Sequence, residues 1–375
     1  GLSEEAYAAY SGTLGNRIAE VKLLLAATDL NQPDLDDDQL AERAAAYQAI
    51  NEQVYGTPEQ GIFSGVVAEL EAIISETDYN GQARDIKEEL DETFFAVHGD
   101  PQAERLPVLT EEARAFLKDM IGRYTGPERA AVARRRELLD AEGRSSFEPE
   151  DMAAIFNDAI AVRGLSWAMK AFIKPGSSMM AWSQEAFGVS VGEGRVPIDT
   201  DDKMYGFTVH EQGLHGIRGF IGRYCTSMSI LGNGIATRTP DGRYKSYITW
   251  EEGDAAVRQS VASNATTPWS IESMRGVLHT GLAYAGNDFR STFETSWRIR
   301  SLLAANQSNG KLSEAAITRA CSQAHDDTLR IYRGTPMDRT AQLDFPVTYN
   351  KDLGPYAPGK VLATNFWNEH AGDEK

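Results

Sequence analysis

Apolar side chains recur at helical spacing through the first third of the chain, and this period limits the possible folds more than any other feature. Leu40, Ala44, Tyr47 and Ile50 lie three or four residues apart, so they share one face of a helix. The two-residue alternation of half-buried strands is absent from this part. Similar patterns predict helices that begin near residues 34–38 and 58, and helices over residues 84–97, 110–124 and 127–143.

The pattern changes after residue 148. A helix is predicted over residues 149–168, followed by short strands over residues 180–190 and 194–198 that flank a Gly-rich turn. We therefore expect a predominantly helical α+β fold, with an acidic helical region at residues 1–147 and a second region, carrying a small sheet, at residues 148–375. Further helices are predicted over residues 271–285, 288–304 and 313–331.

Negative charge is concentrated in the N-terminal part. The chain has 375 residues, 42% of them hydrophobic, which suffices for one large or two modest domains. Residues 1–145 contain 14 Lys and Arg against 29 Asp and Glu, whereas the remainder contains 23 against 26. This balance argues against a nucleic-acid partner, because phosphate binding needs clustered Lys and Arg. The acidic helices could cap a cleft or form a docking surface, and the sequence leaves both open.

Several features indicate a cytoplasmic protein. The sequence has no run of 18 apolar residues, so no membrane span is expected. Its first residues lack the basic and apolar regions of a secretory signal. Cys225 and Cys321 form neither a disulfide framework nor a CxxC pair, and we expect them to be buried free thiols in a reducing compartment.

The most specific motif is HEQGLH at residues 210–215. His210 and His215 are five residues apart, whereas the zinc-binding HExxH motif places its histidines four apart on one helical face. On a regular α-helix the wider spacing would separate the two rings by about 140°, too far to share one ion. A local π-helical turn would bring them back to one face, and Gly213 lowers the cost of that distortion. The spacing therefore predicts a π-helical segment within a buried helix.

A second segment, WEEGDA at residues 250–255, supplies a third ligand. A catalytic Zn²⁺ takes three protein ligands and leaves a position for water, so His210, His215 and Glu252 are the expected ligands. Glu211 is then the expected general base. Thr249 could instead cap a helix whose first turn holds Glu251 and Glu252, and both roles can coexist. Two histidines and one carboxylate also form the facial triad of non-haem iron enzymes, which would leave Glu211 without a role.

The combination of HExxxH and a downstream EEG(x)A segment resembles the metallopeptidases known by their QEGLA motif. This family includes the microtubule-associated tyrosine carboxypeptidases and bacterial relatives described as flavohaemoglobin expression-modulating. In this chain Glu251 stands where the family has Gln, and Asp254 stands where it has Leu, which leaves the role of Glu251 open between cap and competing ligand. Three further segments are similar in the same order: LGNGI at 231–235, IYRGTP at 331–336 and YNKDL at 349–353.

The resemblance implies a zincin-like catalytic region and a zinc-dependent carboxypeptidase that acts on the C-terminus of a peptide or protein. Such an enzyme needs a cation for the terminal carboxylate, and Arg218, Arg333 and Lys351 are the candidates. Tyr332 and Tyr356 are candidates for polarising the scissile carbonyl. The same chemistry would serve an internal peptide bond. A catalytically weak relative acting as a protein-interaction module is the alternative, and the oligomeric state stays open.

Overall fold

The chain folds into two compact units, each built from segments that are far apart in the sequence. The computed structural model describes residues 3–30, 32, 34–100, 102–226, 236–238, 244–332 and 352–371. The first unit comprises residues 1–106, 236–246 and 269–358, and the second comprises residues 107–235, 247–268 and 359–375. This division differs from the predicted linear boundary after residue 147, because residues 107–147 pack with segments that follow them. Within the described residues, helices predominate, and none is long and apolar enough to cross a bilayer.

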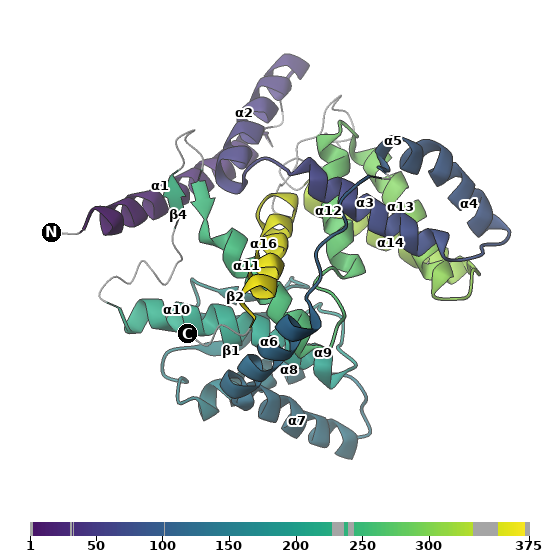
Figure 1. The fold of residues 1–375 in the computed structure, drawn as a ribbon. Helices are drawn as coiled ribbons and strands as arrows, with labels where there is room; N and C mark the ends of the chain where they lie inside the picture. Colours follow the sequence, from purple (N-terminus) through teal and green to yellow (C-terminus); the bar gives the residue numbers. More distant parts are fainter. Residues whose placement is uncertain are drawn as a thin grey trace. The chain divides into compact units, whose positions relative to one another are not determined.

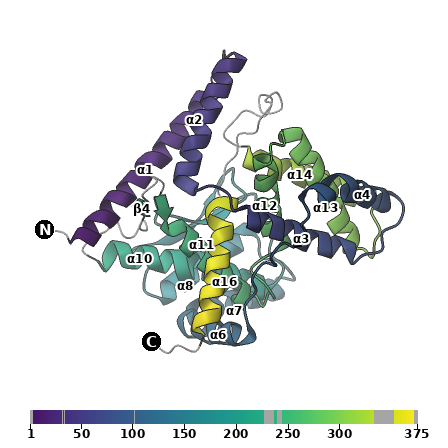
Figure 2. The same ribbon diagram turned by 45° about the horizontal axis from the view of Figure 1, so that its top comes forward.

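Helices form most of the first unit. Two of them, α1 and α2, lie side by side (Figure 2), and their shared core contains Leu23, Leu30 and Tyr47. Asp36 and Gln39 form a capping box at the start of α2, which confirms the predicted helix start. The elements of this unit are α1 (Glu4–Leu30), α2 (Asp37–Tyr55), α3 (Gln60–Ser75), α4 (Gln82–Leu90), η1 (Asp91–Phe95), α5 (Ala96–His98), β4 (Ala236–Arg238), β5 (Tyr244–Ser246), α12 (Ile271–Tyr284), α13 (Phe289–Asn306), α14 (Glu314–Ile331) and η4 (Asp352–Tyr356).

The last three long helices of this unit pack together. In Figure 1, α12, α13 and α14 lie beside one another, and α12 also contacts α3. Their N-termini are capped by Ser270, Asp288 and Ser313, whose side chains accept backbone N–H bonds. The helices predicted from periodicity and caps in this part are therefore confirmed.

The second unit combines helices with a three-stranded sheet. Its strand order is β1-β3-β2, with β1 parallel and β2 antiparallel to the central β3. Helix α8 and the helix that carries the HEQGLH motif contact this sheet, and α11 packs against the motif helix. Its elements are α6 (Glu111–Tyr124), α7 (Gly126–Ala141), α8 (Pro149–Val162), β1 (Lys170–Lys174), β2 (Met180–Ser183), β3 (Gly188–Gly192), α9 (Asp201–Thr208), η2 (Val209–Gly216), α10 (Ile217–Tyr224), α11 (Tyr247–Ala262) and nearly all of α16 (Ala357–His370).

The predicted strands of this unit were partly wrong. The single strand expected over residues 180–190 is two strands joined by a tight turn, in which Phe187 has a φ of 49°. Residues 194–198 form only one bridge, between Ile198 and Phe147. The helix expected to reach residue 168 ends at Val162, because Gly164 takes a φ of 70°.

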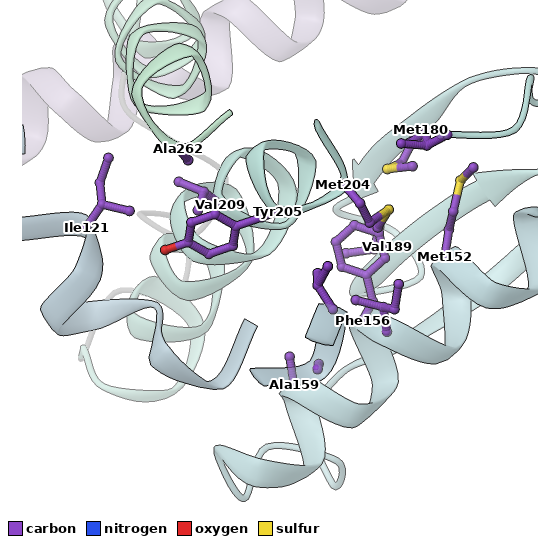
Figure 3. Packing of buried hydrophobic residues seen from close by; sticks show 14 of the residues in the cluster. Ile121, Met152, Phe156, Ala159, Met180, Val189, Met204, Tyr205, Val209 and Ala262 are labelled. Carbon is purple, nitrogen blue, oxygen red and sulfur yellow. The ribbon is translucent and has the colours of Figure 1, made fainter. Parts of the chain in front are cut away.

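Buried side chains from every element of the second unit except α10 form its main core, part of which is drawn in Figure 3. Met204 lies near Phe156 and Val189, while Tyr205 and Val209 lie near Ile121. The helix carrying the motif is therefore anchored on one side by core packing. The cysteines are unpaired: Cys225 is exposed and Cys321 half-buried, so the expectation of two buried thiols is wrong.

Candidate metal centre

The motif helix changes its winding at the predicted place. It begins as the α-helix α9, continues as the π-helix η2 from Val209 to Gly216, and returns to the α-helix α10. Gly213 lies inside η2, where an added Cβ would come within 3.2 Å of Thr125 Cγ2. The i and i+5 spacing of the histidines therefore predicted the local structure correctly.

The π-helical turn brings the two imidazoles together. The ring centroids of His210 and His215 are 4.9 Å apart. One possible ligand atom from each of His210, Glu211 and His215 lies within 4.8 Å of the other two. These side chains are buried or nearly so, and His210 Nδ1 has no hydrogen-bond partner among the described residues.

A fourth side chain reaches the same place from α11. Glu252 Oε2 lies 3.6 Å from the Nε2 atoms of both His210 and His215, whereas Glu211 Oε1 lies 3.9 Å from His210 Nε2. Glu252 is thus at least as close to the imidazoles as Glu211. Helix α11 begins at Tyr247, so Thr249 lies inside the helix and the expected cap at Thr249 is wrong. Because α11 begins earlier than predicted, Glu252 lies in its second turn and not in its first.

Glu251 lies behind His215. Its Oε1 accepts a hydrogen bond from His215 Nδ1 at 2.5 Å, and its Oε2 lies 2.7 Å from Arg218 Nε. A carboxylate in this position fixes the imidazole so that Nε2 faces the shared space, as in many metal sites. In this geometry Glu251 acts neither as a helix cap nor as a competing ligand. Arg218 forms an ion pair with Glu251, so its guanidinium supports the carboxylate that orients His215.

Strand β2 holds Glu211. The backbone N–H of Trp182 donates to Glu211 Oε2 at 2.6 Å, leaving Oε1 toward His210. The Trp182 indole packs against the motif helix at two glycines, where an added Cβ would lie 3.3 Å from it at Gly216 and 3.1 Å at Gly219. Gly216 and Gly219 thus let the strand approach the helix closely enough for its backbone to bind the carboxylate.

Charges in the group are strongly coupled. Burial lowers the pKa of His215, but the hydrogen bonds with Glu251 and Glu252 outweigh this and raise the pKa to about 10. Burial raises the pKa of Glu252, but the adjacent His210 and His215 hold it well below its ordinary value. The carboxylates around His215 therefore favour positive charge at this position.

Two contacts support the motif from behind, and sequence reasoning did not identify either. Buried Glu128 on α7 accepts two bonds from Arg163, both at 2.8 Å, and one from Gln212 of the motif at 3.2 Å. A close crossing lies behind Glu252, where a Cβ on Gly253 would come within 2.0 Å of Gly359 O on α16. Gly253 of the EEG segment therefore permits this helix crossing. The family motif has a glycine at the same position, but the sequence alone did not indicate its role.

The remaining predicted site residues are not brought to this group by any described contact. Tyr332 belongs to the first unit, where its buried hydroxyl donates to Asn287 O at 2.6 Å and burial raises its pKa. Tyr356 lies half-buried in η4 of the same unit. Arg333 and Lys351 lie outside the described residues, as does the LGNGI segment.

No family model, curated protein or solved structure matches this chain. The resemblance to the QEGLA-motif peptidases therefore depends on the short sequence segments alone, and the geometry of the site has to be interpreted from its own residues.

Proposed function

We propose that the protein is a zinc-dependent peptidase whose metal is held by His210, His215 and Glu252. The observation that carries this proposal is the π-helical turn, which places both Nε2 atoms 3.6 Å from one Glu252 oxygen. Ligands bound to one zinc at about 2.0–2.1 Å in tetrahedral geometry lie on the order of 3.3 Å apart, so a small contraction would complete the site. The fold around it is in this proposal a zincin-like arrangement of motif helix and strand.

The charge of the group supports a divalent cation. Glu211, Glu251 and Glu252 carry three negative charges when ionised, and Arg218 carries one positive charge, which leaves two negative charges when the histidines are neutral. Buried charges are costly unless they are compensated. One divalent ion would neutralise the group, with both histidines binding it as neutral imidazoles.

Each protein residue then has a defined task. The metal would activate a water molecule and polarise the substrate carbonyl. Glu211 Oε1 takes a proton from the attacking water and delivers it to the leaving amine, so that water adds across the peptide bond. The Trp182 N–H fixes the other oxygen of Glu211, and Glu251 fixes the ring of His215.

Cleavage at the C-terminus is the finer part of the proposal and follows from the family resemblance. Because Arg218 is paired with Glu251, Arg333 and Lys351 are the better candidates for binding a substrate carboxylate. Tyr332 and Tyr356 stay candidates for polarising the scissile carbonyl on the ground of the family resemblance alone. The proposed substrate is the C-terminus of a peptide or protein in the cytoplasm.

The first test is metal content of the purified protein by elemental mass spectrometry, with His215→Ala and Glu252→Ala alongside. We expect about one zinc per chain, lost in both variants because each removes a ligand. Glu193→Gln, an exposed acid of the same unit, is the control and should keep the metal. Absence of metal from the unmodified protein would favour the interaction-module alternative.

The second test separates binding from catalysis. We expect Glu211→Gln to keep the metal and lower kcat by about 10²–10⁴-fold, the contribution of a general base. Peptides with varied C-terminal residues, each with an amidated counterpart, would distinguish removal of the last residue from internal cleavage. Loss of metal in Glu211→Gln, with metal retained in Glu252→Ala, would exchange the two assigned roles. Full activity in Glu211→Gln would overturn the hydrolytic mechanism.

A further inference from the structure

A second cluster of charge lies in the first unit, around a cavity of about 230 Å³ between α12, α13 and α14. Each helix contributes one arginine to its lining, namely Arg275, Arg300 and Arg319. The side-chain amides of Gln307 and Gln323 also line it. None of the described lining residues is acidic. The positive lining stands out in a chain with a net charge of −18.

The arginines lie at different depths. Arg300 is 5% exposed and forms the floor, where its guanidinium donates to Gln323 Oε1 at 2.9 Å and pairs with Asp327. Arg319 and both glutamines are exposed, so they form the rim. Among the described residues, Arg319 has no ion-pair partner, and the buried Nε of Arg300 has no hydrogen-bond acceptor.

A purely structural role explains only part of this arrangement. Asp327 pairs with Arg300 and lies 3.9 Å from Arg275 Nε, so one carboxylate helps to join the three helices. That network does not include Arg319, which lies about two turns before Asp327 on α14. The helix dipoles add to the positive charge, because the first turns of α12 and α14 border the cavity against the last turn of α13 alone.

The chemistry of the lining defines the ligand class. Guanidinium groups bind phosphate with paired hydrogen bonds, and several of them match a dianion better than a monoanion. The cavity is larger than a bare phosphate needs but smaller than the roughly 300–1,000 Å³ of drug-sized sites. Ile271, Leu303 and Ala316 supply an apolar wall for a small organic group.

We propose that this cavity binds a small soluble phosphate monoester, with Arg300 at its floor and Arg319 at its rim holding the phosphate. The glutamine amides bind polar groups of the organic part, and the apolar wall contacts its carbons. This site is independent of the proposed peptidase activity, since all its lining residues belong to the first unit.

Calorimetric titration of the full chain with glycerol phosphate tests the proposal, with glycerol as the uncharged probe. We expect one site per chain for glycerol phosphate and no binding of glycerol. Arg319→Gln should weaken binding by about ten- to a hundredfold, the loss expected for a charge-assisted hydrogen bond. Because Arg319 is exposed, this variant should fold as the unmodified protein does, which thermal unfolding would verify.

Matched variants separate a built site from general attraction. Arg290→Gln removes an exposed arginine of α13 that pairs with Glu294, and it should leave the affinity unchanged. Ala316→Leu should abolish binding by filling the cavity without altering charge. Equal weakening in Arg319→Gln and Arg290→Gln, or no binding of glycerol phosphate at millimolar concentration, would overturn the proposal. Binding only to vesicles that contain a phosphoinositide, and not to the free ester, would reject the soluble ligand.

Discussion

Among the described residues, the two units hold partly buried charge clusters with an excess of opposite sign. Around His210 and His215, the described carboxylates outnumber the guanidinium of Arg218, whereas around Arg300 the guanidinium groups outnumber the carboxylate of Asp327. Buried charge is normally compensated, so an excess of one sign indicates a ligand of the other. The proposed cation in one unit and the proposed anion in the other therefore rest on the same physical argument.

A balanced cluster provides the reference for both. Glu128 is fully buried, and its two oxygens receive the bidentate bonds of Arg163, one carboxylate for one guanidinium. The two charges of this pair compensate each other without a ligand, and Glu128 also accepts a hydrogen bond from Gln212 of the motif helix. Variants of the balanced pair should therefore change folding stability, whereas variants of the imbalanced clusters should change ligand binding.

The largest effect is expected for Glu128→Gln. This change leaves the guanidinium of Arg163 partly buried without its counter-ion, which costs about 3–5 kcal/mol when a buried pair is broken. Calorimetric unfolding would measure the loss and would separate the transitions of the two units if they unfold independently.

A double variant distinguishes an unpaired charge from lost packing. Glu128→Gln combined with Arg163→Met removes both charges and should recover part of the loss, because no uncompensated charge is left. If Glu128→Gln alone lowers the free energy of unfolding by less than about 1 kcal/mol, water already compensates the charge of Arg163. The Glu128–Arg163 pair could then not serve as the balanced reference for the other two clusters.

A smaller effect is expected for Glu251→Gln. The amide can still contact His215, but it no longer provides the charge that sets the ring's tautomer, so zinc affinity should fall by about 10–100-fold. Competition with a chromophoric chelator measures this affinity. Unchanged affinity would show that Glu251 supports α11 and not the histidine, while a loss as complete as in Glu252→Ala would make Glu251 a direct ligand.

Local features of the fold could be predicted from the sequence, and long-range ones could not. Helix spans such as residues 271–285 follow from apolar spacing and caps, and the π-helical turn follows from His210, His215 and Gly213, because these signals act within one or two turns. The pairing of β1 with β3 and the bond from Trp182 to Glu211 depend on segments brought together by folding. Neighbouring residues carry no signal for such contacts.

The same limit explains why the cap at Thr249 was wrong and why the role of Glu251 stayed open. Thr249 and Glu251 looked like a helix start because an acidic first turn has that composition. The helix actually extends to Tyr247, and Glu251 is directed by His215 and Arg218, which lie more than thirty residues earlier. The motif spacing therefore indicated which side chains lie together, and it did not indicate which residues orient them.

The smallest effect concerns a balanced group that is also a helix cap. Asp151 receives hydrogen bonds from Arg144 and from the Glu148 N–H at the start of α8. Burial raises its pKa, but these bonds and the nearby Arg135 lower it more, so the net shift is downward. Its contribution to stability is therefore present above the ordinary pKa of Asp, near 3.8, and is lost as the pH falls through the folded-state value. We expect Asp151→Asn to cost about 1–2 kcal/mol at pH 7 and to flatten the decline of stability as the pH falls below the ordinary pKa of Asp, as followed by urea unfolding. A variant whose acid decline matches that of the unmodified protein would place the titrating carboxylates elsewhere, with the acid-rich cluster around His215 as the next group to examine.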